Sequence, residues 1–306
     1  MNLETLQLYC DVVRLRSFSR GASANDVSQS AASQAIQQLE ADLDVHLLDR
    51  TKRPFTVSPE GRMFYEACRD LLDRYEQAKA RISSAGTRLE GTVRVAAIYS
   101  VGLHDVSRHL QAFMSAHPQA KVRLECLHPQ KVVEAVVNDE ADIGIMSYPP
   151  AMRSLTVIPW RSEKMVLVCH PSHRFAKRRL VMAADLNGEK FVAFDPDLGI
   201  RKAIDRSLKQ RNAKVNVVME FDNIETIKQA IAIGAGVSIL PRATVLKEVG
   251  IGSLAAVPLG IPDLKRPVGI IYRKQKQLSP TVARFIESLR KAEHNAKGVI
   301  ARERSD

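Results

Sequence analysis

Apolar and polar positions in residues 17–39 follow the spacing of two short helices joined by a tight turn. The first helix is predicted over about residues 19–24, with a serine at its N-cap, and the turn occupies residues 25–27. Ser28 is placed to cap the second helix. The apolar positions of that helix recur at i, i+4 and i+7, at Ala32, Ile36 and Leu39.

The other face of the second helix consists of serine, glutamine and alanine. Glutamine can form two hydrogen bonds with adenine, serine can bond several base edges, and alanine leaves room for a thymine methyl. A helix with this face suits the major groove of DNA, although a solvent-facing helix pair in an ordinary globular protein has a similar composition. The residues predicted to contact DNA are Ser28, Gln29, Ser30, Ala32, Ser33, Gln34 and Gln37.

Residues 45–57 have the pattern of a wing, a two-stranded hairpin beside a helix-turn-helix. Apolar residues at 45–48 and 55–57 predict two short strands, and residues 51–54 form a basic turn between them. Positive side chains at the tip of a wing lie where phosphates or an adjacent minor groove are found. The wing residues predicted to bind DNA are Arg50, Lys52 and Arg53.

Apolar residues between positions 64 and 89 recur at alternating steps of four and three. This 3.5-residue repeat is typical of a coiled-coil seam, whereas a helix packed on its own domain follows 3.6 and drifts. The helix would be about 45 Å long at about 1.5 Å per residue. We predict a dimer seam, with an intramolecular packing helix as the alternative. The seam residues are Phe64, Cys68, Leu71, Tyr75, Ala78, Ile82, Ala85 and Leu89.

From residue 91 onward, strand and helix patterns alternate. Repeated β–α units favour an α/β fold with a mostly parallel sheet and helices on both faces. The strands are predicted at 92–98, 121–126, 141–146, 165–169, 191–194, 215–221, 237–241 and 267–272. The helices are predicted at 106–117, 130–138, 200–211, 224–233 and 281–293.

The composition is that of a globular chain long enough for two or three domains, with 306 residues, 45% apolar and 26% charged. The net charge is +11, yet residues 1–90 hold 12 Lys and Arg against 13 Asp and Glu, while the remaining residues hold 33 against 21. The positive surplus therefore lies outside the predicted DNA-reading segment, where it can serve solubility or long-range steering.

The residues give no support to an enzyme, a metal protein or a membrane protein. GxSxG, HExxH, Walker A and complete GxGxxG motifs are absent, so no catalytic residue and no cofactor is predicted. The cysteines have neither CxxC spacing nor a nearby histidine pair, and buried, reduced thiols are expected at Cys10, Cys68, Cys126 and Cys169. Without a secretory signal or a membrane-spanning run, a cytoplasmic protein is expected.

In their order and spacing, these motifs resemble those of the LysR-type transcriptional regulators. The chain departs from the family pattern at three positions: Gln34 replaces a usual arginine, Ser30 a frequent proline, and Asn25 a buried leucine. An amide without hydrogen bonds at residue 25 would loosen the helix packing. The residues that carry the resemblance are Phe18 to Arg20, Val27 to Ile36, Leu39-Glu40, Leu43, Leu47 to Arg50, Thr56 to Gly61, Ala141 to Ile145 and Ile233 to Pro241.

The resemblance implies an N-terminal winged helix-turn-helix, a long linker helix and a periplasmic-binding-protein-like effector domain with two subdomains. The expected domains are a DNA-binding domain at 1–58, a linker and dimerisation helix at 59–90, an effector-binding domain at 91–293 and a polar tail at 294–306. Subdomain I would comprise about 91–161 and 267–293, and subdomain II about 162–266.

The resemblance also implies a sequence-specific, DNA-binding transcriptional regulator. Its partners would be double-stranded promoter DNA, further copies of itself in a homodimer or a tetramer of two dimers, and a small-molecule effector. Some family members sense peroxide through a cysteine pair, for which this chain offers Cys126 and Cys169. The effector would lie at the carboxyl ends of strands, between the subdomains. The expected contacts are Ser100, Tyr148, Asp195, Arg201 and Thr226.

Two other classes of protein compete with this interpretation. A bilobal solute-binding protein without catalytic activity uses the same α/β module, but the predicted winged N-terminus and the missing signal peptide argue against it. An enzyme with a regulatory N-terminal domain is disfavoured because no activated nucleophile or metal cluster is evident. Deletion of residues 1–58 separates the classes, since only a regulator would lose its target.

Overall fold

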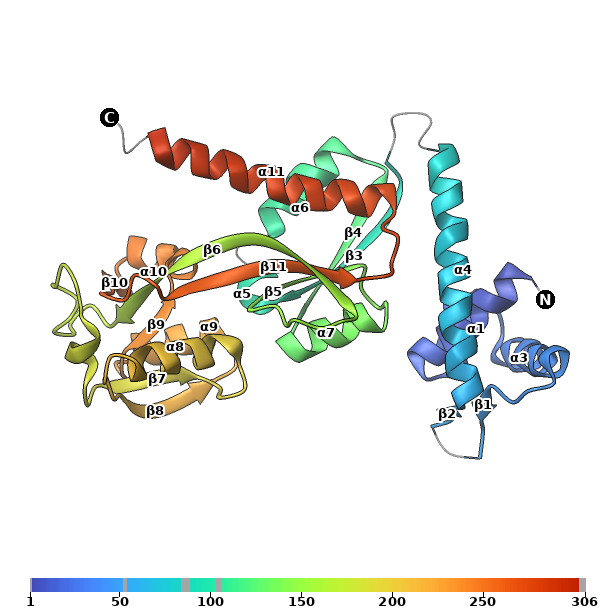
Figure 1. Ribbon diagram of the computed structural model, residues 1–306, viewed down its shortest axis with the longest axis horizontal. Coiled ribbons are helices and arrows are strands. Elements are labelled where there is room, and N and C mark those ends of the chain that lie inside the picture. The colour runs from blue at the N-terminus through green and yellow to red at the C-terminus, as the bar shows by residue number, and fades with distance from the viewer. Residues whose placement is uncertain (1, 52–53, 84–88, 103–105, 303–306) are drawn as a thin grey trace. The chain divides into compact units, whose positions relative to one another are not determined.

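The computed structural model describes residues 2–51, 54–83, 89–102 and 106–302. The chain forms two compact units (Figure 1). Unit 1 ends at Glu90 and includes Gln275–Ala283, and unit 2 contains Gly91–Lys274 and continues from Arg284. Each unit has a hydrophobic core of its own.

Unit 1 is a winged helix-turn-helix followed by a long helix. The predicted pair of helices is confirmed, and so is the hairpin, although its strands are shorter than expected. Lys52 and Arg53, predicted at the tip, lie outside the described residues. The elements are α1 Leu3–Leu15, α2 Phe18–Ala24, α3 Gln29–Leu43, β1 Leu48–Asp49, β2 Thr56–Val57 and α4 Pro59–Ser83.

Serine caps and an apolar stripe determine where α2 and α3 lie. The hydroxyls of Ser17 and Ser28 accept hydrogen bonds from the backbone N–H groups of Arg20 at 3.3 Å and Ala31 at 3.1 Å, which begins each helix. The predicted apolar stripe of α3 is confirmed, because its three residues are at most 1% exposed: Ala32, Ile36 and Leu39.

Asn25, which replaces the leucine expected from the resemblance, has its amide hydrogen-bonded. Its Nδ2 donates to Asp11 Oδ2 at 3.1 Å and to the carbonyl of Gly21 at 2.9 Å. Asp11 is itself buried, so the amide joins α1 to the end of α2 in a place that a leucine would fill by packing. The loosening that an unbonded amide would cause therefore does not arise.

The start of α4 packs inside its own chain. Tyr9 donates its hydroxyl to the carbonyl of Gly61 at 2.8 Å, and the Tyr9 and Phe64 ring centroids lie 5.6 Å apart. Cys68 is 3% exposed in the same core. Cys68 is therefore a correction to the predicted dimer seam, because the core of unit 1 already covers it, whereas Phe64 is half-buried and keeps part of its surface free.

Farther along α4, apolar side chains face solvent. Leu71 and Tyr75 are 48% and 45% exposed, and Ala78 is exposed as well. The side chains of Ile82 and Ala85 fall outside the described residues, and the half-buried Leu89 follows the described end of α4.

Unit 2 contains a seven-stranded sheet and a separate pair of strands. The order of the large sheet is β10-β6-β11-β5-β3-β4, with β9 also paired to β6, and the small sheet is β7-β8. The strands are β3 Gly91–Ile98, β4 Ala120–Leu127, β5 Ile143–Ser147, β6 Leu155–Cys169, β7 Lys190–Phe194, β8 Asn216–Phe221, β9 Ser238–Pro241, β10 Ala255–Pro258 and β11 Lys265–Arg273.

The long strands β6 and β11 correct the expectation of a mostly parallel sheet. β3 pairs parallel with β4 and β5, and β7 with β8. However, β11 runs antiparallel to β5 and β6, and β6 runs antiparallel to β9 and β10. The sequence predicted only the last five residues of β6, because charged positions such as Arg161 and Glu163 interrupt the apolar pattern of its first part.

β6 and β11 join two subdomains (Figure 1). We define subdomain I as β3 to β5 with α6, α7 and α11, and subdomain II as β7 to β10 with α8 to α10. Figure 1 shows α6 and α11 on one side of the strands of subdomain I and α7 on the other. The helices are α5 Tyr99–Val101, α6 Ser107–Ala116, α7 Pro129–Val137, α8 Gly199–Lys209, α9 Ile224–Ala232, α10 Leu246–Gly250 and α11 Pro280–Arg302, with 3-10 turns η2 Ala183–Leu186 and η3 Arg242–Val245.

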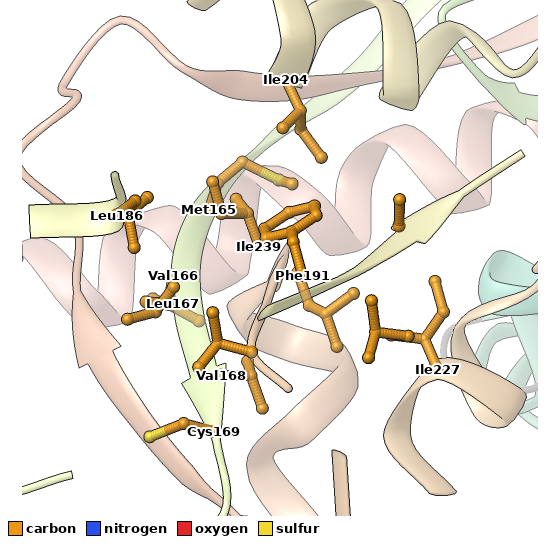
Figure 2. Close-up of a cluster of buried hydrophobic side chains, with 14 of the residues drawn as sticks. Met165, Val166, Leu167, Val168, Cys169, Leu186, Phe191, Ile204, Ile227 and Ile239 are labelled. Carbon is orange, nitrogen blue, oxygen red and sulfur yellow. The ribbon is translucent and has the colours of Figure 1, made fainter. Parts of the chain in front are cut away.

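The core of subdomain II forms between the end of β6 and the helices α8 and α9, as Figure 2 shows. Residues 165–169 of β6 are all buried, and antiparallel strands β9 and β10 pair with this segment. The side chains that meet them from other elements are at most 1% exposed: Phe191, Ile204, Ile227 and Ile239. This core supports the ends of β7 and β8, which lead to residues that line a cavity between the two subdomains.

The bonded amide of Asn25 leads to a stability prediction. Asn25→Ala leaves a buried oxygen of Asp11 with one donor fewer, and we expect a loss of about 1–2 kcal/mol in unit 1. Hydrogen exchange of α1 and α2 peptides should speed up roughly 5- to 30-fold. Gln38→Ala, at an exposed position of α3, is the control, and equal exchange in both variants would contradict the prediction.

Candidate functional site

In unit 1, α3 presents a polar face to solvent. Gln29, Ser30, Gln34 and Gln37 are exposed, and Ser33 is half-buried. Ser28 is also exposed, but its hydroxyl is engaged as the helix N-cap. Because the opposite side of α3 is buried in the core, these side chains have a fixed direction and can meet a flat or grooved partner together.

Ala32 is a correction to the predicted DNA contacts. It is 0% exposed, because it belongs to the stripe that holds α3 on the core. The small residue on the outer face is Ala31, one position earlier. The helical spacing with Ile36 and Leu39 was the signal that separates the two alanines.

A buried carboxylate, Glu40, joins α3 to the wing. Its Oε1 accepts hydrogen bonds from the backbone N–H groups of Leu47 at 2.8 Å and Leu48 at 3.0 Å. Its Oε2 forms an ion pair with Arg50 at 2.9 Å. Glu40 is 8% exposed, so these charge-assisted bonds act in a site that is largely shielded from water. The orientation of the wing relative to α3 therefore depends on one side chain.

Arg50 occupies a different position from the predicted wing tip. Besides Glu40, its guanidinium donates to Ser33 Oγ at 3.4 Å and lies over the Phe18 ring at 5.2 Å from the centroid. It thus sits at the base of the hairpin, against α3 and α2. The Arg50 side chain is still 30% exposed, so it can contact a phosphate while it keeps these bonds.

In unit 2, a cavity of about 310 Å³ lies between the two subdomains. It opens at the carboxyl ends of the β strands, where α/β folds place their ligands. Its walls are mostly apolar, with a few polar side chains from both subdomains and from β11. The polar residues used below are Ser100, His128, Tyr148, Asp197, Asp222 and Arg266.

Arg266 is a buried cation on the floor of this cavity, with 1% of its surface exposed. Its guanidinium donates to Ser100 Oγ at 2.9 Å and to Glu163 Oε2 at 2.5 Å. Glu163, on the neighbouring strand β6, also pairs with Arg161 at 2.7 Å. A charge this deep is tolerated because it is paired and hydrogen-bonded.

Polar contacts also cross the mouth of the cavity. Gln130 Nε2 donates to Asp197 Oδ2 at 3.4 Å, and His128 Nε2 lies 3.9 Å from the same oxygen. The side of subdomain II nearby is acidic. Burial, and then the charges of Asp222, Asp197 and Glu220, raise the pKa of the Asp195 carboxyl. A ligand at this end meets negative charge, while the floor carries a cation.

The structure brings two of the five expected effector contacts to the cavity. Ser100 lies on the floor, and Tyr148 lies at the wall, where its hydroxyl donates to the carbonyl of Lys265 at 3.0 Å. Burial raises the pKa of Tyr148 to about 12, so its hydroxyl stays protonated. Both can still offer hydrogen-bonding atoms to a ligand.

The other three expected contacts do not line the cavity. Arg201 donates to the carbonyl of Phe194 and pairs with Asp205 at 2.8 Å and Glu220 at 2.6 Å. Thr226 bonds the cap of α9 through its backbone N–H and its hydroxyl. Asp195 follows β7 with its N–H bonded to Phe221. Local partners within subdomain II therefore occupy these side chains or backbone groups.

Several polar residues of the site were missed from the sequence. Glu40 lies in the Leu39-Glu40 pair that carried the resemblance, which was the available signal. His128 stands between a strand and α7, a position that sequence reasoning could have included. For Arg266 the sequence offers no such signal, because a charged residue before Pro267 is expected to be exposed.

The described residues hold no cluster of histidine, cysteine and acidic side chains suited to a metal ion. Burial raises the pKa of Cys126, and raises that of Cys169 to about 11, which disfavours the thiolate at both positions. Among the described residues, no helix is both long and apolar enough to cross a membrane.

Two family models match the chain. The model described as a bacterial regulatory helix-turn-helix protein of the lysR family matches residues 3–62, and the LysR substrate binding domain matches residues 86–293. Together they match most of the chain and residues in both units.

Relatives match over nearly the whole chain. The HTH-type transcriptional regulator YeiE of Escherichia coli is 28% identical, covering 94% of this chain and 96% of its own length. The regulator YfeR of Shigella flexneri is 30% identical, covering 91% and 90%. The structure of full-length OxyR from Pseudomonas aeruginosa has a TM-score of 0.78 at 22% identity, covering 96% and 94%, which shows a shared fold.

The Glu40 contacts predict how strongly the wing depends on them. Glu40→Ala leaves two backbone N–H groups and a guanidinium without their acceptor, so we expect unit 1 to lose about 2–4 kcal/mol. Glu40→Gln, which keeps one carbonyl oxygen, should lose less. The measurement is hydrogen exchange of β1 and β2, with Glu66→Ala at an exposed site of α4 as the control. A wing as protected in Glu40→Ala as in the control would refute this role.

The buried Arg266 predicts the stability of unit 2. Arg266→Ala leaves Glu163 with one partner fewer in a buried site, and we expect a loss of about 3–5 kcal/mol. Trp160 is the one tryptophan of the chain and lies in unit 2, so urea unfolding followed by its fluorescence reports on this unit. Lys265→Ala, exposed on the same strand, should shift stability by less than about 0.5 kcal/mol. Similar midpoints for the two variants would disprove the prediction.

Proposed function

We propose a mode of action on one premise: the chain belongs to the LysR family of DNA-binding transcriptional regulators, which are not enzymes and carry an effector-binding domain. The observation that supports the proposal most directly is the outer face of α3, where exposed glutamines and serines are held on a buried apolar stripe. We take promoter DNA as the partner of this face, and we therefore infer that the protein acts in the cytoplasm.

Base contacts are assigned to the exposed residues of α3. Gln29, Gln34 and Gln37 can each form paired hydrogen bonds with adenine, and Ser30 and Ser33 can bond several base edges. Ser28, whose hydroxyl caps α3, has its backbone N–H at the start of the helix, where it can donate to a phosphate. With Gln34 in place of the usual arginine, the site has one cation fewer and one amide more, which favours adenine over guanine at the base that it meets.

Self-association is assigned to the free part of α4. Leu71, Tyr75 and Ala78 continue the heptad spacing beyond the half-buried Phe64 and the buried Cys68, and they are exposed in the single chain. Burying them against a second α4 would remove apolar surface from water in a homodimer. A tetramer built as two such dimers is the larger assembly that we propose.

The effector is assigned to the cavity of unit 2, with Ser100 and Tyr148 among its contacts. The two subdomains share β6 and β11, so a ligand that touches both can favour one arrangement of the pair over another. In a dimer or tetramer this would change the spacing of the paired α3 helices and with it the bend of the DNA. The effector thereby acts on transcription through geometry.

DNase footprinting on the DNA upstream of the protein's own gene tests the proposal at a stated salt concentration. We expect protection of at least two half-sites about one helical turn or a multiple of it apart. Gln34→Ala should weaken protection by about 1–3 kcal/mol, or roughly 5- to 150-fold, because the substitution removes one bidentate hydrogen-bonding pair with a base.

Gln111→Ala is the matched control, since Gln111 is an exposed glutamine of α6 in unit 2 and lies outside the DNA-binding unit. Equal weakening in both variants would overturn the assignment of the face. Absence of protection, followed by a failed selection of binding sites from random duplexes, would overturn the reading of DNA by α3.

A further inference from the structure

The end of subdomain II farthest from the cavity carries a dense positive charge. Residues 171–190, 206–216 and 259–264 hold nine Lys and Arg against three Asp and Glu. By contrast, residues 1–90, which contain the DNA-reading helix, hold no positive excess. A large part of the chain's surplus is therefore gathered on one surface of the effector domain.

Contacts between three loops bring these residues together. The carbonyl of Lys214 accepts from the N–H of Gly188 at 2.8 Å, and its own N–H donates to Asn187 Oδ1 at 2.7 Å. His173 lies 3.4 Å from Glu189. The N–H of Gly260 donates to Val181 at 2.8 Å. The loop after β6, the start of β7 and the end of α8 thus meet at one end of the subdomain.

All three carboxylates of this surface are already paired. Glu189 binds Arg174, Asp185 binds Arg178 at 2.8 Å, and Asp263 binds Arg211. Six further cations are exposed, and in the part of the chain that the structure describes none has a carboxylate within ion-pair distance. We call them the distal basic face: Lys177, Arg179, Lys190, Arg206, Lys209 and Lys214.

The distal basic face lies on a folded scaffold. Phe175 is 0% exposed and anchors the loop that carries Lys177 and Arg179, with the guanidiniums of Arg174 and Arg178 over its ring at 4.6 Å and 5.6 Å. The opposite ends of β7 and β8 lead into Asp195, Asp197, Glu220 and Asp222. Subdomain II is therefore polarised along about 17 Å of strand.

We propose that the distal basic face binds the phosphate backbone of DNA that flanks the sequence read by α3. This rests on the proposed function, because it requires a protein already held on DNA. Phosphates attract unpaired lysines without needing a particular base sequence. Four of the six residues are lysines, a type depleted from protein–protein interfaces, which favours DNA over an acidic protein as the partner. The face would supply the electrostatic affinity that residues 1–90 lack.

The test compares two duplexes bound by the full-length protein over a range of salt concentrations. One duplex contains only the footprinted sequence, and the other adds about 30 base pairs of natural flank at each end, enough for contacts outside the read sequence. We expect wild type to bind the long duplex more tightly and with a steeper dependence of log K on log salt. In Lys177→Gln/Lys209→Gln/Lys214→Gln, the slope on the long duplex should fall by about 0.9 for each phosphate that is no longer neutralised. Its binding to the short duplex should match wild type.

A control variant with the same change in net charge is Arg153→Gln/Lys164→Gln/Lys247→Gln, three exposed cations outside the distal basic face. It should keep the advantage of the long duplex. If the distal variant keeps that advantage too, DNA is the wrong partner, and an acidic protein surface becomes the alternative to test. Wild type that binds both duplexes equally overturns this proposal alone, whereas wild type that binds neither overturns the proposed function.

Discussion

The effector domain depends on two paired antiparallel strands that a buried ion pair links. β6 and β11 are the elements common to both subdomains, and Glu163 and Arg266 face each other across them. Charges buried to this degree are costly unless their partners are in place, so the pair favours one register of the two strands. The same guanidinium holds Ser100 at the floor of the cavity. Strand register and the floor of the cavity are therefore set by the same contact.

The DNA-binding unit uses a related arrangement on a smaller scale. Glu40 accepts hydrogen bonds from two backbone N–H groups and pairs with Arg50, which joins α3 to the wing. In both units, a carboxylate and an arginine determine how two elements meet, while apolar packing supplies most of the burial. Packing tolerates small shifts between elements, whereas a charge-assisted hydrogen bond weakens steeply with distance and angle.

Local signals predicted much of this fold. Serine caps, the i, i+4, i+7 stripe of α3 and the alternation of strands and helices each act within a few residues, and the structure contains them. Long-range choices were less accessible. A heptad pattern ran unbroken through Cys68 and Leu71, yet the core of unit 1 buries the first and leaves the second exposed. For the same reason, nothing near Arg201 shows that Glu220 pairs with it, although Asp205 at i+4 was a readable partner, and nothing near Arg266 shows that it is buried.

Glu40 bonds to main-chain atoms of residues 47 and 48, which has a consequence for how such a domain can diverge. The side chains at these positions can be exchanged for others that fill the same space, because every residue except proline offers the same N–H. The outward residues of α3 are likewise separate from the contacts that hold the helix in place. Single substitutions on the outer face of α3 can therefore change the preferred DNA sequence during evolution. They do so without destabilising the folded domain.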